Sequence, residues 1–301
     1  MSHTTDAADA FRRPLNLTAP TELLALLRRY SVRPRKRLGQ NFLVDAHVLA
    51  NIVSAAQLSS QDQVLEIGAG VGTVTRALAR TAKRVTTIEL DQHLEPILHE
   101  TLDEFSNVEL VIADVLLLSL PELLTGDPWK IVANLPYYVT TPILTRLLEL
   151  NQYISLIVIM VQREVADRLR AAPGGKAYGS LSILVQWRCE IEHINQVSRN
   201  CFLPAPQVDS SLLRLRMRTS PPVAVQDEAH FFRVVHAAFG QRRKTLLNAL
   251  TGVAELDIGK AQVTASLQAA GIDPRRRGES LSLAEFAALS DALQRKEQPA
   301  V

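Results

Sequence analysis

The sequence QVLEIGAGVGT occupies residues 63–73 and joins an apolar strand to a glycine-rich turn and a helical segment. Glycines there let the backbone bend tightly and approach a ligand without an intervening Cβ. A dinucleotide-binding turn reads Gly-x-Gly-x-x-Gly, but Thr73 stands where the third glycine would fall, and the Gly-Lys-Ser/Thr of a P-loop is missing. Gly68 and Gly70 are therefore predicted to bind a nucleoside cofactor without a pyrophosphate. Glu66, just before them, could face a cationic ligand or orient the loop.

Strand and helix patterns alternate around this stretch. Strands are predicted at residues 63–67, 84–89, 108–112, 130–133 and 155–160, and the first two are followed by helices at 73–82 and about 94–102. Such alternation predicts the α/β class, with a mostly parallel sheet wound on both faces. Ligands of these sheets bind at the carboxyl ends of the strands. The functional residues should therefore gather at that edge.

The chain is predicted to contain two domains. A strand at 211–217 closes the first, a proline-containing linker follows at 219–222, and later apolar patterns are helical. The expected division is a mobile N-terminal extension at 1–20, an α/β domain at 21–219 and a small helical domain at 220–301.

Two acidic residues end the strands that follow the turn. Glu89 lies 19 residues after Gly70, where a carboxylate can bind both hydroxyls of a ribose. Asp114 follows the next strand and could accept a hydrogen bond from an adenine amine. Taken alone, Glu89 is equally well explained as a solvated strand end and Asp114 as a helix N-cap. Their order after the glycine-rich turn favours ligand binding.

The tetrapeptide Asn134-Leu135-Pro136-Tyr137 follows the strand at 130–133. The adenine N6 amine is a poor nucleophile because its lone pair is delocalised, and two acceptors, the Asn134 amide oxygen and the Leu135 carbonyl, would favour its pyramidal form. Pro136 stiffens the loop. Tyr137 can stack on the base for about 1–3 kcal/mol, and Phe202 could supply a second face to a base taken out of its stack.

A proline-containing turn would explain the tetrapeptide alone, and a core position would explain Phe202. After a cofactor-binding turn, the tetrapeptide predicts methyl transfer from S-adenosylmethionine to adenine N6.

Composition limits the partners and the compartment. The 301 residues carry a net charge of only +2, yet basic residues cluster at 28–37, 214–218, 242–244 and 275–277. Clusters of this kind favour nucleic acid as a partner, although each alone is more often a solvated face. The two cysteines form no CxxC pair, so we expect no metal site and no disulfide. No apolar run reaches the about 18 residues of a membrane span, and no signal sequence is recognised. A soluble, cytoplasmic protein is expected.

From about Arg35 onward the chain resembles the ribosomal RNA adenine N6,N6-dimethyltransferases, and in particular their bacterial small-subunit (16S) branch. The matching residues are 38–43, 66–72, 89–91, 114, 134–138, 162–165, 202–210 and 242–250. The resemblance implies a Rossmann-like methyltransferase domain followed by a small helical domain. It also implies that Asn41 and Leu43 contact the cofactor, S-adenosyl-L-methionine. The substrate would be two adjacent adenines near the 3′ end of 16S rRNA in the 30S subunit, with a role in subunit biogenesis. We expect a monomer that does not associate with membranes.

Three alternatives remain at this point. The nearest is the resistance-type branch, which uses the same tetrapeptide on large-subunit rRNA; the segments at 202–206 and 275–283 favour the small-subunit branch. A ribosome-assembly factor in which binding matters more than catalysis is the second, and the intact tetrapeptide argues against it. An NAD-dependent oxidoreductase is disfavoured by Thr73.

Overall fold

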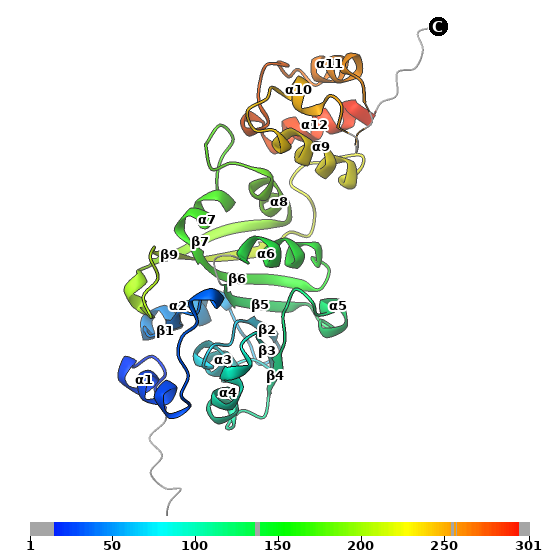
Figure 1. Ribbon diagram of the computed structural model, residues 1–301. Coiled ribbons are helices and arrows are strands. Elements are labelled where there is room, and N and C mark those ends of the chain that lie inside the picture. Colours follow the sequence, from blue (N-terminus) through cyan, green and yellow to red (C-terminus); the bar gives the residue numbers. More distant parts are fainter. Residues whose placement is uncertain (1–14, 136–138, 254–255, 257, 295–301) are drawn as a thin grey trace, which may run out of the picture. The chain divides into compact units, whose positions relative to one another are not determined.

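The computed structural model describes residues 15–135, 139–253, 256 and 258–294 (Figure 1). The chain groups into two compact units. The first contains Met1–Ile143, Gln152–Arg163 and Glu192–Leu215, and the second contains Leu144–Asn151, Glu164–Ile191 and Arg216–Val301. Pro136 and Tyr137 lie outside the described residues.

A seven-stranded sheet, ordered β4-β3-β2-β5-β6-β9-β7, organises the chain. Its strands are β2 (Gln63–Ile67), β3 (Arg84–Glu89), β4 (Val108–Ile112), β5 (Trp129–Asn134), β6 (Ile154–Gln162), β7 (Cys189–Val197) and β9 (Ser210–Met217). Strands β4, β3, β2, β5 and β6 pair in parallel, which confirms the predicted α/β class. The sequence reasoning missed β7. It lies at the end of the sheet and carries exposed charged residues such as Glu190, so it lacks the apolar run that marks a central strand.

The first unit packs its helices around the sheet. They are α1 (Pro20–Arg29), α2 (Ala46–Ala56), α3 (Thr73–Ala79), α4 (Glu95–Leu102), α5 (Leu120–Leu123) and the start of α6 (Thr140–Glu149). Apolar residues of α2 and α3 bury against strands of the sheet, and a second cluster joins α1 to α4. A two-stranded ribbon pairs β1 (Phe42–Leu43) with β8 (Phe202–Leu203). Of the predicted N-terminal extension, 1–14 lie outside the described residues, whereas Leu17 is buried in the cluster of α1 and α4.

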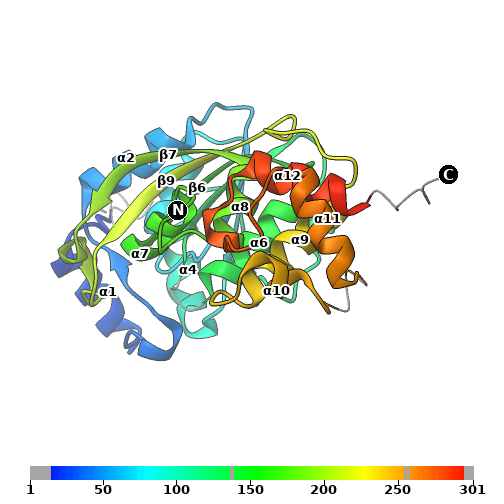
Figure 2. The same cartoon turned by 90° about the horizontal axis from the view of Figure 1, so that it is seen from above.

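The second unit is mainly helical. It contains most of α7 (Arg163–Leu169), with α8 (Ser180–Arg188), α9 (Glu228–Gly240), α10 (Leu246–Leu250), α11 (Lys260–Ala269) and α12 (Leu283–Gln294). Helices α9 to α12 lie close together in both views (Figures 1 and 2). The Trp187 ring of α8 stacks on Phe231 of α9, with centroids 4.3 Å apart. This shared core explains why residues 164–191 group with the C-terminal helices, although the sequence-based division placed them before residue 219.

Candidate active site

A cavity with a volume of ≈ 200 Å³ lies at the carboxyl ends of the central strands. Residues of five segments contribute to its walls: 38–43, 67–71, 88–90, 113–116 and 134–135. Four of the five follow or end β2, β3, β4 and β5. The carboxyl edge of the sheet, where the sequence predicted the functional residues to gather, therefore contains a cavity. The position of each predicted site residue can be described relative to this cavity.

Gly68 and Gly70 both line this cavity, in the turn between β2 and α3. The Gly68 N–H donates to the Ile88 carbonyl over 2.9 Å, which ties the turn to β3. Gly68 has φ +91°, and a Cβ there would lie 3.3 Å from the backbone oxygen of Asn134. A side chain would thus strain the backbone and press on the end of β5. The turn therefore brings Gly68 close to Asn134, the first residue of the tetrapeptide predicted to bind the base.

Glu89 also lines the cavity, and both its oxygens are held by the backbone. Oε2 accepts a hydrogen bond from the Gly70 N–H over 2.8 Å, and Oε1 accepts one from the Asp91 N–H over 2.9 Å. Burial raises the pKa of Glu89, while these backbone hydrogen bonds oppose the rise. The carboxylate is therefore fixed in orientation at the wall, as ribose recognition would require.

Glu66 lies elsewhere. Its Oε2 accepts hydrogen bonds from the hydroxyls of Thr75 and Thr87, the latter over 2.7 Å. Glu66 is not among the residues that line the large cavity, but it borders a separate small one of ≈ 10 Å³. Burial raises the pKa of its carboxyl to about 7, against the effect of the hydroxyl hydrogen bonds. Of the two roles the sequence left open, this position supports orientation of the loop.

Asp114, Asn41 and Leu43 line the cavity as well. Asp114 Oδ1 accepts a hydrogen bond from the Leu116 N–H over 2.9 Å, so the carboxylate closes its own turn while it faces the cavity. Asn41 Nδ2 donates to the Gly39 carbonyl over 2.8 Å. Of the two explanations offered for Asp114, the helix N-cap is wrong, because the side chain caps a turn and α5 begins only at Leu120. A contact between the carboxylate and a ligand is compatible with this geometry.

Asn134 ends β5 and lines the cavity together with buried Leu135. Phe202 lines it from β8, where it pairs with Leu43 and also belongs to the apolar core. The core explanation of Phe202 therefore holds, and its place on the cavity wall leaves the stacking role a prediction. The structure brings Asn134, Leu135 and Phe202 to one cavity, and the parts of the proposed catalytic group at Pro136 and Tyr137 stay predictions.

Sequence reasoning missed much of the apolar wall, including Leu90, Val115 and Leu116. The signal for these residues is only their place directly after Glu89 and Asp114. Thr73 was noticed for the glycine it replaces, but it also lines the cavity, and its buried hydroxyl has no hydrogen-bond partner among the described residues. A ligand polar group would satisfy it.

The charge of the cavity is one-sided. Glu89 and Asp114 are its only charged lining residues, and no Lys, Arg or His of the described chain contributes to the wall. A pyrophosphate would meet uncompensated carboxylates here, whereas a cation would be attracted. Within the described ranges no group of His, Cys, Asp and Glu could hold a metal ion.

The basic clusters divide into paired and unpaired cations. Arg214 and Arg218 form ion pairs with Glu192 and Glu190 of β7. Arg242 lies 3.4 Å from Glu279. By contrast, several exposed cations have no ion pair within the described part of the chain: Arg28, Arg33, Arg37, Arg243, Lys244 and Arg277. Cluster membership in the sequence therefore does not indicate which side chain is free to meet a polyanion.

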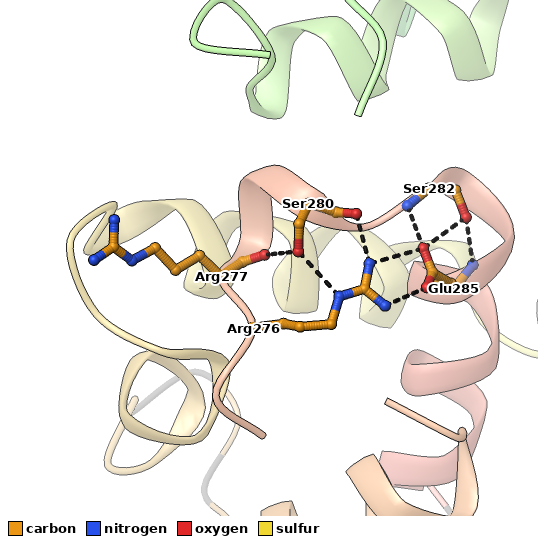
Figure 3. A network of polar contacts seen from close by, with 5 residues as sticks. All are labelled: Arg276, Arg277, Ser280, Ser282 and Glu285. Atoms are coloured by element: carbon orange, nitrogen blue, oxygen red, sulfur yellow. Dashed lines mark hydrogen bonds and ion pairs between the residues drawn. The ribbon is translucent and has the colours of Figure 1, made fainter. Parts of the chain in front are cut away.

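The run at 275–277 shows this division within one segment (Figure 3). Arg275 pairs with Asp273 over 2.8 Å, and Arg276 binds the Glu285 carboxylate at the start of α12. Glu285 also accepts from the Ser282 N–H over 2.8 Å, and the hydrogen bond from Arg276 lowers its pKa to about 2. The Arg277 side chain extends away from this network. Arg276 is therefore a structural residue, whereas the Arg277 side chain is available to bind a polyanion.

Comparison with known proteins identifies the family. Residues 32–295 match the sequence profile of the family described as ribosomal RNA adenine dimethylase. The chain belongs to this family. It is an enzyme that dimethylates adenine in ribosomal RNA.

Relatives of the dimethylase cover nearly the whole chain. "Ribosomal RNA small subunit methyltransferase A" of Geobacillus thermodenitrificans is 48% identical over 92% of this chain and 97% of its own. The protein of the same name from Clostridioides difficile is 44% identical over 90% and 94%.

Solved structures agree on the Rossmann-like methyltransferase fold. A dimethyladenosine transferase from Plasmodium falciparum has a TM-score of 0.68 and 25% identity over 82% of this chain and 95% of its own. The 23S rRNA methyltransferase ErmE has a TM-score of 0.66 and 28% identity over 84% and 99%. Among the described residues, no helix has the length and apolar character needed to cross a bilayer.

Proposed function

We propose that the dimethylase transfers methyl groups from S-adenosyl-L-methionine, bound in the large cavity, to N6 of two adjacent adenines near the 3′ end of 16S rRNA in the 30S subunit. The carrying observation is the combination of Asn134 and Leu135 with two carboxylates and no cation around one cavity. The small-subunit relatives at 44–48% identity favour 16S rRNA over the large-subunit substrate of ErmE at 28%. We further propose that it acts as a monomer in the cytoplasm, during assembly of the small subunit.

The cavity fits the proposed cofactor. A ribose would be held by Glu89, whose orientation the amides of Gly70 and Asp91 already fix. Asp114 would accept from the adenine amine, with Asn41 and Leu43 on the wall of the same cavity. When bound, the cofactor supplies an electrophilic methyl on a positively charged sulfur, and the carboxylates favour that charge. An unpaired Thr73 hydroxyl offers one further donor.

The chain's own residues then act on the target base. The Asn134 side-chain oxygen and the Leu135 carbonyl would accept the two N6 hydrogens and stabilise the geometry in which the nitrogen lone pair leaves the ring plane. Phe202 borders the same cavity and would contact a face of the base, opposite the stacking contribution expected of Tyr137. No strong general base is required, because a methylated N6 ammonium is acidic and can lose its proton to water.

The first experiment measures transfer of tritiated methyl groups from S-adenosylmethionine to unmethylated 30S and 50S subunits, with nucleoside analysis of the product. We expect dimethyladenosine in 30S RNA alone. Label in 50S RNA would assign the chain to the large-subunit substrate, and absence of label in both would leave binding to the ribosome as the main function.

Asn134→Ala tests the catalytic group. The variant should lose methyl transfer by at least about 100-fold, the effect of removing one oriented acceptor in a dry site, while calorimetry finds cofactor affinity within a few-fold of native. An equal loss of both would show that Asn134 mainly supports the structure of the cavity. Retained binding of the variant to 30S particles would separate catalysis from assembly.

RNA binding is proposed for the unpaired cations. Arg277→Ala should weaken binding of 30S RNA and reduce the slope of log affinity against log salt by about 1, because one phosphate contact is lost. The matched control is Arg275→Ala, which removes an equal charge from the same segment but one that Asp273 already neutralises. Equal effects of the two variants would contradict the division into paired and unpaired cations.

A further inference from the structure

Asp91 gathers contacts from a distant segment of the chain. It lies two residues after Glu89 and is buried, yet it does not line the large cavity. Its Oδ2 accepts from Gln40 Nε2 over 2.8 Å, and its Oδ1 lies 3.3 Å from Arg35 Nη1. The backbone N–H of His93 also donates to Oδ1 over 3.2 Å. Burial opposes ionisation of Asp91, but these contacts together outweigh it and hold its pKa below the usual value.

The contacts reinforce one another within the segment. The Arg35 N–H donates to Gln40 Oε1 over 2.8 Å, and Arg35 Nη2 lies 3.0 Å from His93 Nε2. The Gln40 side chain therefore binds both the Asp91 carboxylate and the backbone of Arg35, and the Arg35 side chain reaches the same carboxylate. One carboxylate thus organises both, which makes the arrangement a network rather than a single surface ion pair.

The segment held in this way, residues 35–43, contributes a wall of the large cavity through its later residues. All residues from Leu38 to Leu43 line that cavity. Asp91 is also linked to Glu89, another lining residue of the cavity, because its N–H donates to Glu89 Oε1. A single residue therefore connects the wall at 38–43 to the carboxylate proposed to bind ribose.

The two ends of the segment are held differently. At its C-terminal end, Phe42 and Leu43 are buried and pair with β8. Between residues 34 and 41, no described side chain is buried. Without core contacts, the N-terminal part of the wall must depend on polar interactions, and Asp91 supplies the buried partner for them.

We propose that Asp91 is a positioning residue that fastens residues 35–43 as a wall of the cofactor cavity. Cofactor affinity then depends on a carboxylate that does not touch the cofactor, and the cofactor in turn stabilises the fastened segment, because linkage is reciprocal. The inference rests on the proposed function in one respect, that the cavity binds S-adenosylmethionine.

Two readouts on Asp91→Ala test the proposal. The first is the rate of tryptic cleavage after Arg35, Lys36 and Arg37, followed by mass spectrometry; Arg33 precedes Pro34, and that bond resists trypsin. The second is the affinity for S-adenosylmethionine by calorimetry. We expect cleavage to rise and affinity to fall, each by about ten-fold, since a buried charged partner is lost. At saturating cofactor, kcat should stay within about three-fold, because the catalytic group is unchanged.

Conservative and second-site variants keep the test decisive. Asp91→Asn should recover part of both effects, since its amide oxygen can still accept from Gln40. Arg35→Ala removes a half-exposed partner that does not line the cavity, so it tests the same link while the buried Asp91 carboxylate stays in place. In this variant cleavage is measured after Lys36 and Arg37. Saturating cofactor should slow cleavage of the native protein.

Glu100→Ala is the matched control. Glu100 is another carboxylate of this unit that binds N-terminal side chains, Arg29 and Tyr30, but neither of them lines the cavity. Its loss should leave affinity and cleavage at 35–37 unchanged. Faster cleavage of Asp91→Ala and Arg35→Ala with unchanged affinity would show that residues 35–43 do not contribute to cofactor binding. Unchanged cleavage would show that Asp91 does not hold this segment in place. Failure of the native protein to bind S-adenosylmethionine would instead contradict the proposed function, whatever the cleavage rates.

Discussion

The ends of β2 and β3 place the same side chain in two different environments. The strands are parallel, and Glu66 lies beside Thr87 in their register, while Glu89 lies two residues farther along β3. Two residues of a strand span about 6.6 Å. At the inner level the carboxylate of Glu66 meets the hydroxyls of Thr75 and Thr87; at the outer level that of Glu89 meets backbone amides at the wall of the large cavity.

The comparison shows that depth along the strand separates a loop-orienting carboxylate from a ligand-binding one. Helix α3 covers the inner level, because Thr75 lies on it and donates to Glu66. The outer level stays open, since the chain turns at Gly68 to Gly72 before α3 begins. Side-chain chemistry is identical, so the difference arises from what each level of the sheet faces. Three predictions test it, in descending order of expected effect.

The largest concerns the pH dependence of stability. Burial raises the folded-state pKa of Glu66 from 4.5 to about 7, so the folded protein holds this proton more tightly than the unfolded chain. The resulting stabilisation is fully present below about pH 4.5 and is lost as pH rises through 7, a change of roughly 3 kcal/mol. Glu66→Gln cannot titrate, so its unfolding free energy relative to the native protein should rise by roughly that amount between pH 4.5 and 8.

Urea unfolding at several pH values measures this difference. Trp129 of β5 reports on the first unit, and Trp187→Phe in both proteins removes the signal of the second. Other ionisable groups are common to both proteins and cancel in the comparison. Parallel pH profiles would show that the Glu66 carboxyl titrates normally, and the distinction between the two levels of the sheet would fail.

The sequence predicts only in part which of the two glutamates, Glu66 or Glu89, lies at the cavity. Apolar runs located β2 and β3 residue for residue, and the glycines after β2 located the turn. Which glutamate faces the cavity depends on the covering by α3, and therefore on Thr75, nine residues after Glu66. A polar hydroxyl in a helix gives no signal of its partner. Spacing alone thus placed Glu89 in the ligand site and left both roles of Glu66 open.

Charged clusters show the same limit of sequence reasoning. Arg276 and Arg277 are identical neighbours, and only tertiary structure pairs the first with Glu285 on α12. Strand β7 was missed because its charged residues, including Glu190 and Glu192, form ion pairs with arginines later in the sequence and are not buried in a core. Local patterns report burial well, but they do not report the partner of a charged side chain.

The second prediction concerns cofactor affinity. Glu89→Ala should weaken binding of S-adenosylmethionine by about 100-fold, equivalent to about 2.7 kcal/mol, because it removes the proposed ribose acceptors and leaves the Gly70 and Asp91 amides unpaired. Glu66 does not line the cavity, and Gln has nearly the same shape and can still form hydrogen bonds. Glu66→Gln should therefore bind S-adenosylmethionine within about three-fold of the native affinity. Calorimetry on both variants measures the contrast. Unchanged affinity in Glu89→Ala would exclude the ribose assignment.

The smallest effect separates the hydroxyl contacts of Glu66 from general packing. Thr87→Val keeps the shape of the side chain but removes one donor, and it should cost about 1–2 kcal/mol at pH 8, where Glu66 is ionised, and less at pH 5, because hydrogen bonds to a charged acceptor are stronger. Thr86→Val is the matched control. Thr86 is buried on the same strand, but its side chain points to the opposite face and donates to Glu109 over 3.2 Å.

The control should show no change in cost between these pH values. In a Glu66→Gln background the pH dependence of Thr87→Val should disappear, since the acceptor can no longer become charged. Persistence of that dependence would assign it to another group near β3, most directly Glu89. The double variant therefore decides whether the hydroxyls act on Glu66 itself, which is the contact that distinguishes the inner level of the sheet from the outer one.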